Sequence, residues 1–280
     1  MLIEPEMEPL IGKWCAVKEG SHVLDVGCGT GYFTRLLKRT VPGARLTGLD
    51  AEEEFVLRAR EEAGKAGLDI EFLAGYAETL PFEENSFDVV VSHTFLTIAS
   101  DPARVFGEMK RVVRPGGRIA SVTPMSFSPH GISVGTYPTE CGWGKELMEM
   151  TRDLSMAYNK LMPLINFVCG VPPTELPIFF ARQGMKNICA YPIGFFFSLS
   201  NGAVPMENKR LWLELYEKSE FEKLDTYMKM PEMRELFSEE KAERYRQLIR
   251  EKCDYYRARP EENAIWEWIG GSTLLVTGDT

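Results

Sequence analysis

The chain has 280 residues, of which 44% are hydrophobic and 26% charged, as in an ordinary soluble globular protein. Its formal net charge of −9 disfavours nucleic acid as a partner, because affinity for phosphates comes largely from lysine and arginine. No run of about 18 apolar residues is present, so we expect no membrane span, and the acidic, proline-containing start MLIEPEMEPL favours a cytoplasmic protein.

The first 123 residues alternate between strand and helix patterns. Short apolar runs predict five strands, at 22–26, 45–50, 70–74, 87–92 and 118–123. Amphipathic segments predict helices at 32–40, at 51–67, and from a cap at Asp101 to the RPGG stop at 114–117. Continuous apolar strands separated by such helices are typical of an α/β fold whose parallel sheet is covered on both faces and binds ligands at its carboxyl rim.

From residue 124 the pattern changes to a long loop rich in Gly, Pro, Ser and aromatic residues. Further on, the sequence predicts helices near 145–168, 174–183 and 206–258, extended segments at 186–191 and 194–199, and a strand at 272–277. We therefore expect a core at 1–123, and a substrate-facing loop with mainly helical insertions at 124–265, interrupted by a returning core strand near 186–199. A final core strand follows within 266–280.

The segment VLDVGCGTGYFT, residues 23–34, ends a strand in a glycine turn (residues 27–31). The nicotinamide fingerprint is GxGxxG, but here the pattern is GxGxG and Tyr32 stands where the third glycine would be. Asp50 closes the next strand, where a carboxylate accepts both hydroxyls of a ribose or caps the following helix. Asp25 is suited to receive an ammonium group or to hold the turn itself.

Four motifs in this order resemble the class I S-adenosylmethionine-dependent methyltransferases, particularly the subgroup that modifies small molecules and lipids, including quinones and sterols. They are VLDVGCGTG, LTGLD, GYAETLPFEENSFDVVVS and DPARVFGEMKRVVRPGGRI, and the likeness covers roughly residues 20–123. The resemblance implies a doubly wound, mostly parallel, seven-stranded Rossmann-like sheet with a helical cap. It also implies S-adenosylmethionine as cofactor and S-adenosylhomocysteine as product.

The resemblance further implies the residues that would surround the cofactor. These are Asp25, Gly27, Cys28 and Gly29 at the methionine part, Asp50 at the ribose, Ala51 and the Ala77 amide at the adenine, and Ser92 and His93 under the sulfonium. One position departs from the family, which commonly reads GDAE where this chain has GYAE. Tyr76 there would stack on the base or donate its hydroxyl, or Glu78 would take over the lost contact.

Methyl transfer from a sulfonium needs alignment first, and a general base only when the acceptor must lose a proton. His93 and His130 are the candidate bases on the rim, with cleft-lining and ordinary loop roles as their alternatives. Tyr137, Trp143 and Phe195 to Phe197 are candidates for a pocket that takes a flat or apolar acceptor, with core packing as the alternative. No His, Cys or carboxylate cluster has the spacing of metal ligands.

The leading interpretation of the sequence is therefore a small-molecule methyltransferase. A second is an enzyme of the same fold that uses S-adenosylmethionine for another transfer or for an intramolecular cyclisation. A third is a non-catalytic, cofactor-binding regulatory protein.

Overall fold

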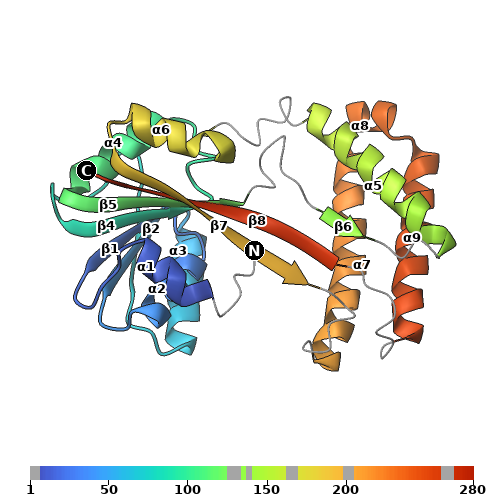
Figure 1. The fold of residues 1–280 in the computed structure, drawn as a ribbon, viewed down its shortest axis with the longest axis horizontal. Helices are drawn as coiled ribbons and strands as arrows, with labels where there is room; N and C mark the ends of the chain where they lie inside the picture. The colour runs from blue at the N-terminus through green and yellow to red at the C-terminus, as the bar shows by residue number, and fades with distance from the viewer. Residues whose placement is uncertain (1–6, 125–133, 137–140, 162–169, 198–204, 260–267) are drawn as a thin grey trace. The chain divides into compact units, whose positions relative to one another are not determined.

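The computed structural model describes residues 7–124, 134–136, 141–161, 170–197, 205–259 and 268–280. The chain forms two compact units (Figure 1). The first contains residues 1–132, 168–195 and 271–280, and the second contains residues 133–167 and 196–270.

The sheet of the first unit has the strand order β3-β2-β1-β4-β5-β8, and β7 also pairs with β8. Its strands are β1 (His22–Val26), β2 (Arg45–Asp50), β3 (Glu71–Ala74), β4 (Phe87–His93), β5 (Val113–Pro124), β7 (Lys186–Phe197) and β8 (Trp268–Asp279). Neighbours from β3 to β5 are parallel, and β8 runs antiparallel to β5, with Ser121 opposite Val276. The expected seven-stranded, mostly parallel sheet is confirmed.

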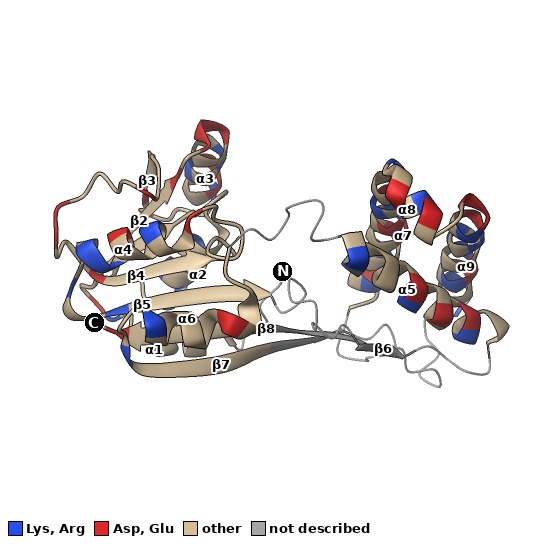
Figure 2. Cartoon of the chain, turned by 90° about the horizontal axis from the view of Figure 1, so that it is seen from above, with Lys and Arg blue, Asp and Glu red and all other residues tan. Residues whose placement is uncertain are grey.

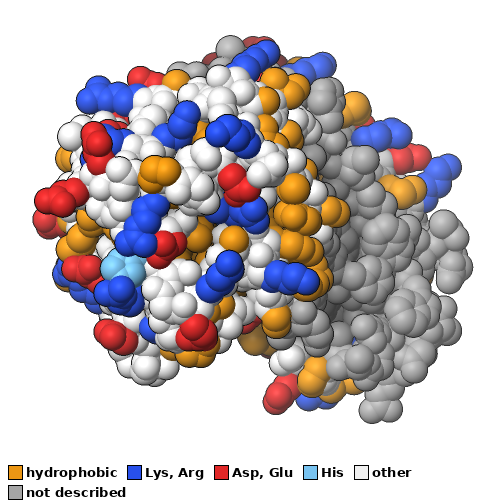
Figure 3. All heavy atoms as spheres, turned by 60° about the vertical axis from the view of Figure 1, so that its left-hand side comes forward, with side chains coloured by type: hydrophobic (Ala, Val, Ile, Leu, Met, Phe, Trp, Pro, Cys, Tyr) orange, Lys and Arg blue, Asp and Glu red, His pale blue; other side chains and the backbone are white. Residues whose placement is uncertain are grey.

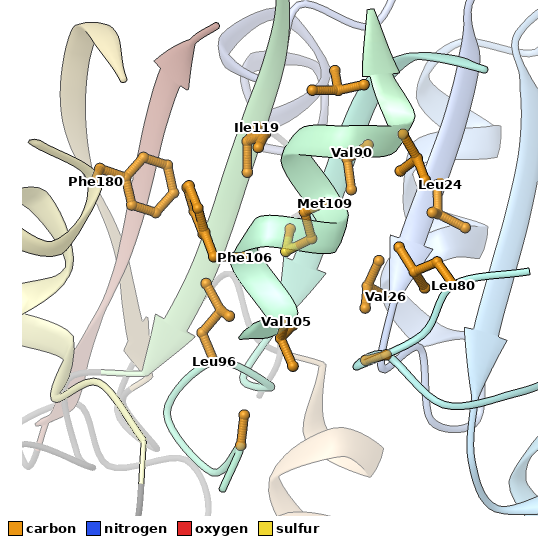
Figure 4. Packing of buried hydrophobic residues seen from close by; sticks show 14 of the residues in the cluster. Leu24, Val26, Leu80, Val90, Leu96, Val105, Phe106, Met109, Ile119 and Phe180 are labelled. Atoms are coloured by element: carbon orange, nitrogen blue, oxygen red, sulfur yellow. The ribbon is translucent and has the colours of Figure 1, made fainter. Parts of the chain in front are cut away.

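Both faces of this sheet are buried, and successive residues of β4 show it. Val90 packs with α4 (Pro102–Val112) and α6 (Leu176–Arg182), whereas Val89 and Val91 pack with α1 (Glu8–Trp14) and α2 (Tyr32–Thr40). Figure 4 shows the first of these cores around Phe106 and Met109 of α4. Because side chains alternate across a strand, every second residue at the carboxyl rim points to the same face.

The helices of this unit agree with the sequence to different degrees. Asp101 caps α4 as expected, because its Oδ1 accepts a hydrogen bond from the amide of Arg104 at 3.0 Å. The helix predicted at 51–67 is shorter, since α3 spans Glu53–Lys65. Helix α1 was not predicted, because its seven residues are too few to show a periodic apolar pattern.

The second unit consists mainly of helices. They are α5 (Gly142–Leu161), α7 (Met206–Met228), α8 (Pro231–Leu236) and α9 (Glu239–Ala258). The stretch predicted as helical from 206 to 258 is three helices, because Pro231 and the Ser238 cap restart the chain. Here β6 (Val134–Thr136) pairs antiparallel with the first residues of β8.

Basic and acidic residues are interspersed along the helices of the second unit (Figure 2). Arg244 and Lys241 of α9 pair with Glu146 and Asp153 of α5. Both signs are also intermingled on the face of the first unit that Figure 3 shows. Among the described residues, no helix is long and apolar enough to cross a bilayer, and no group of His, Cys and carboxylates is arranged to hold a metal ion.

Candidate functional site

The glycine turn lies at the carboxyl end of β1. Its three glycines, Gly27, Gly29 and Gly31, all have positive φ, at 70°, 52° and 72°. The amides of Gly27 and Cys28 both donate to the carbonyl of Leu49, at 2.8 and 3.0 Å, so the turn is fastened to the end of β2. A left-handed backbone of this kind costs a residue with a side chain about 1–2 kcal/mol, which explains the residue type at all three positions.

The three glycines face different surroundings. A methyl group at Gly27 would lie 2.3 Å from the ring of Phe95, and one at Gly31 would lie 2.7 Å from the ring of Phe72. A methyl group at Gly29 would meet nothing within 4 Å. Two of the glycines are therefore required by the packing of the chain itself, and Gly29 is the one whose backbone is open to an incoming ligand.

Asp50 joins the end of β2 to this turn. Its Oδ2 accepts from the amide of Gly29 at 2.7 Å, and its Oδ1 accepts from the amide of Glu52 at 3.1 Å. An ionised carboxylate has about four acceptor sites. Asp50 can thus hold the turn and the start of α3 while still accepting hydroxyl groups of a ligand.

Asp25 is fully buried beneath the turn. Its Oδ2 accepts from the Thr34 hydroxyl at 2.6 Å, whereas its Oδ1 is buried with no hydrogen-bond partner among the described residues. Burial raises the pKa of this carboxyl from 3.8 to about 7. A buried acceptor without a donor is costly, and a cationic donor such as an ammonium group would satisfy it.

His93 lies at the end of β4, on the same face of the sheet as Asp25. Its ring stacks on Phe33 of α2, with centroids 5.4 Å apart and planes 14° apart. Nε2 is buried without a partner in the described part of the chain, and burial lowers the pKa of His93 to about 4. The imidazole is therefore neutral at pH 7.

Ser92 points to the opposite face from its neighbour His93. It is fully buried, and its hydroxyl donates to the Ser121 hydroxyl at 3.2 Å across β4 and β5. The Ser92 side chain therefore bonds within the sheet. Of Ser92 and His93, only His93 lies on the same face of the sheet as Asp25.

The residues expected around an adenine differ in exposure. Ala51 is exposed, Ala77 is buried with 5% of its surface exposed, and Tyr76 has 71% of its surface exposed. The amide of Gly75 donates to the carbonyl of Asp50 at 2.9 Å, which places the Tyr76 segment beside the end of β2. An exposed ring at this place presents a free face on which a base could stack.

Of the expected acceptor residues, Trp143 has a described side chain. His130 and Tyr137 lie outside the described residues, as do the side chains of Phe195 to Phe197 at the end of β7. Trp143 is buried in the core of the second unit, with its ring centroid 5.6 Å from that of Tyr255. Core packing explains Trp143.

Two residues near the turn were missed by the sequence analysis. Thr34 donates to Asp25, and Phe95 packs on Gly27. A threonine in the first turn of the helix after the glycine turn was a usable signal for the first. Nothing in the sequence distinguishes Phe95 from an ordinary core residue.

A hollow of about 670 Å³ lies at the other edge of the sheet. It is lined by the segment before β1, the amino end of β4, the start of β5 and the end of β8. Two of its carboxylates, Asp88 and Asp279, are paired with Arg114 and Arg118 at 2.6 and 2.8 Å. Ligands of open α/β sheets bind beyond the carboxyl ends of the strands, so we place the site at the glycine turn.

Known proteins are similar to the part of the chain that contains the glycine turn. A family model described as "Methyltransferase domain" matches residues 24–121. Demethylmenaquinone methyltransferase of Listeria welshimeri is 38% identical over 112 residues, which are 39% of this chain and 48% of that protein. Arsenite methyltransferase of Halobacterium salinarum is 36% identical over 118 residues, 41% of this chain and 30% of that protein. The chain thus spans less than half the length of these relatives.

Solved structures share the fold at low identity. A protein of Bacillus halodurans C-125 is 16% identical with a TM-score of 0.53, and the match covers 98% of both chains. The 4+2 cyclase SpnF has the same identity and TM-score over 98% of this chain and 80% of its own. Phosphoethanolamine N-methyltransferase 2 of Haemonchus contortus, solved with S-adenosyl-L-methionine, is 18% identical with a TM-score of 0.51 over 98% of this chain and 52% of its own.

Proposed function

Because residues 24–121 form a methyltransferase domain of the class I S-adenosylmethionine-dependent type, we propose that this chain transfers the methyl group of S-adenosylmethionine to a small-molecule acceptor. The observation that carries the proposal is the glycine turn. A side chain at Gly29 would meet no atom of the chain, so the turn is open to a ligand there. Asp50 accepts a hydrogen bond from the Gly29 amide. The buried Oδ1 of Asp25 has no hydrogen-bond partner among the described residues.

The residues present fit this cofactor. Asp25 Oδ1 would accept the ammonium of its methionine part, Gly27 to Gly29 would lie along that part, and Asp50 would accept the ribose hydroxyls. Ala51, Tyr76 and the amide of Ala77 would surround the adenine, with the exposed Tyr76 ring stacking on the base in place of the usual carboxylate contact. Cys28 is buried at the turn, and burial raises the pKa of its thiol, so it would act as a small apolar wall rather than as a nucleophile.

Bound S-adenosylmethionine supplies a methyl group already activated by a sulfonium. The chain's own contribution is then alignment, worth up to about 7–11 kcal/mol when the geometry is ideal, and exclusion of water. We assign His93 to the wall of the site, because a buried imidazole whose pKa is about 4 is a weak proton acceptor at pH 7. It would serve as a base only for an acceptor that is itself acidic, and His130 stays the other candidate.

The acceptor class is proposed from two considerations. The relatives are named for demethylmenaquinone and arsenite, both small, which favours a small acceptor here. The aromatic residues Phe195 to Phe197 favour a flat or apolar one. Nucleic acid is a poor candidate, given the net charge of −9.

Isothermal titration with S-adenosylmethionine and S-adenosylhomocysteine tests the cofactor. We expect binding by the wild type that Asp50→Asn weakens by about 100-fold, because the variant loses charge-assisted bonds to both the ribose and the Gly29 amide. Asp88→Asn is the matched control, since Asp88 also accepts a backbone amide, that of His22 at 2.8 Å, but at the other edge of the sheet. Binding of NAD instead, or no binding, would overturn the proposal.

Product analysis by mass spectrometry then separates the possible reactions. A methylated acceptor together with S-adenosylhomocysteine supports methyl transfer. Another alkylated product, or a cyclised acceptor with the cofactor unchanged, would identify a different use of the same site. Tight cofactor binding without turnover on a panel of quinols, phenols, amines and arsenite would favour a regulatory binding protein.

A further inference from the structure

The segment after β4 is a tight turn that carries Phe95. Thr94 has a positive φ of 63°, and its amide donates to the carbonyl of Val122 in β5 at 2.6 Å. The amides of Ile98 and Ala99 both donate to the carbonyl of Phe95 at 2.9 Å. A left-handed conformation at a β-branched residue is strained, so it persists only where neighbouring contacts hold it.

Gly170 and Val171 provide such contacts from a distant part of the chain. The amide of Gly170 donates to the carbonyl of Thr97 at 3.0 Å, and the amide of Val171 donates to the carbonyl of Leu96 at 2.9 Å. The Leu96 side chain is fully buried and lies beside Val105 (Figure 4). The turn is thus held by the core through Leu96 and by two hydrogen bonds from the place where the chain returns to the first unit.

The contact at Gly170 is too close for any side chain. A methyl group there would lie 2.1 Å from the carbonyl oxygen of Leu96 and 2.8 Å from the carbonyl carbon of Thr97. Both are backbone atoms, which cannot move aside as the end of a flexible side chain can. An alanine at 170 would therefore displace the Leu96–Thr97 backbone.

That displacement would reach the glycine turn through Phe95, the residue before Leu96. Two ring atoms of Phe95, Cγ and Cδ2, lie 2.3 and 2.4 Å from where a methyl group on Gly27 would stand, so the ring rests directly on the Gly27 backbone. We propose that Gly170 is a positioning residue for cofactor binding, which holds the Leu96–Thr97 backbone so that Phe95 supports the glycine turn. The inference rests on the proposed function, because the turn is taken to bind the cofactor.

Gly170→Ala and a matched control, Gly117→Ala, test the inference. A methyl group at Gly117 would also meet backbone oxygens, those of Asp88 at 2.7 Å and Arg114 at 2.8 Å, but at the amino edge of the sheet. Titration of S-adenosylhomocysteine well below the melting temperature should show affinity reduced by about tenfold or more in Gly170→Ala, since small misplacements are costly in a preorganised site. Gly117→Ala should stay within about twofold even if it lowers the melting temperature equally.

A double-mutant cycle with Phe95→Leu shows whether the effect passes through Phe95. If it does, Gly170→Ala should change affinity by less than about twofold in the Phe95→Leu background. Faster hydrogen exchange at the amides of Gly27 and Cys28 in Gly170→Ala is expected too, and this readout needs no ligand. Should Gly170→Ala fail to fold, Phe95→Leu alone should reproduce the loss of affinity and the faster exchange.

The outcomes separate the two proposals. Wild-type binding with equal affinities for Gly170→Ala and Gly117→Ala, or an undiminished effect in the Phe95→Leu background, would overturn the role of Gly170 alone. A wild type without affinity for the cofactor would overturn the proposed function and this role together.

Discussion

Polar groups are treated differently in the two units. In the second unit, charges on neighbouring helices meet in pairs at the surface, and the buried Lys252 lies over the ring of Tyr216, 4.2 Å from its centroid. In the first unit, Asp25 and His93 are buried with ring or carboxyl atoms that no described group satisfies. Among the described residues, buried side-chain atoms without a hydrogen-bond partner also occur at Thr151 of the second unit and at His22. Asp25 and His93 differ in that they lie on one face of the sheet at its carboxyl rim and have shifted pKa values, which favours this rim as the candidate site.

The largest effects are expected from substitutions of Gly27 and Gly29. Comparing the two should distinguish a loss of packing within the chain from a loss of cofactor binding. Gly27→Ala combines a φ of 70° with a methyl group 2.3 Å from Phe95, so we expect loss of several kcal/mol of stability as well as loss of cofactor binding. In Gly29→Ala the added methyl group meets no atom of the chain, so stability should fall only by the backbone strain of about 1–2 kcal/mol. Cofactor binding should still be lost, because the methyl group would occupy the space proposed for the ligand. Urea denaturation and titration calorimetry on both variants check this, and equal stabilities would contradict it.

Asp25 should make the ligand-free protein less stable as pH rises. Its pKa is raised from 3.8 to about 7 on folding, so the folded state holds a proton that the unfolded state releases, and stability falls between these values by on the order of 4 kcal/mol. Asp25→Asn should flatten this slope in denaturation series from pH 4 to 8, whereas Asp88→Asn should keep it.

Cofactor binding should show the reverse pH dependence at the same residue. An ammonium group favours the ionised form of Asp25, so the affinity for S-adenosylhomocysteine should rise by up to about tenfold per pH unit below pH 7 and level off above it. Titrations at pH 5.5, 6.5 and 8 measure this. An affinity independent of pH in the wild type would remove Asp25 from the ammonium site.

His93 should act on stability in the opposite direction. Its pKa falls from 6.5 to about 4 on folding, so the unfolded state binds a proton more readily than the folded state between these values. The free energy of unfolding should therefore be unaffected by His93 above pH 6.5 and should fall by on the order of 3 kcal/mol as the pH drops to 4. His93→Phe, which keeps a ring against Phe33, should be more stable than the wild type at pH 4.5. Turnover should stay within about tenfold if His93 is a wall, whereas a loss of about 10²–10⁴-fold would make it the base.

The smallest effect is expected in the second unit. Arg244 pairs with Glu146, but both side chains are more than a third exposed, so Arg244→Ala should cost less than about 1 kcal/mol. Cofactor affinity should be unchanged, as measured by the same titration. A large change in affinity would contradict the assignment of the cofactor site to the first unit alone.

The sequence predicted the elements that positioned the site, because those elements have local causes. Short continuous apolar runs predict the strands from β1 to β5, and Asp101 marks the start of α4 through a cap. The surroundings of the site depend on contacts between distant residues, which no local pattern contains. Phe95 on Gly27 and Gly170 against Leu96 are such contacts, and the burial that perturbs Asp25 and His93 arises only when the sheet and α2 come together.

The pairing of β5 with β8 has a consequence for the order of folding. Arg118 stands opposite Asp279, so the sheet of the first unit is completed only when the segment from 273 to 279 reaches a partner strand far earlier in the chain. The contacts between α5 and α9 join residues that are closer in the chain, 88 apart for Asp153 and Lys241 against 161 for Arg118 and Asp279, and α9 is synthesised before β8. Contacts between residues closer in the chain tend to form faster. During synthesis, the inserted helices should therefore fold before the sheet that precedes them closes, and until then the edge of β5 is exposed to chaperones or to mispairing.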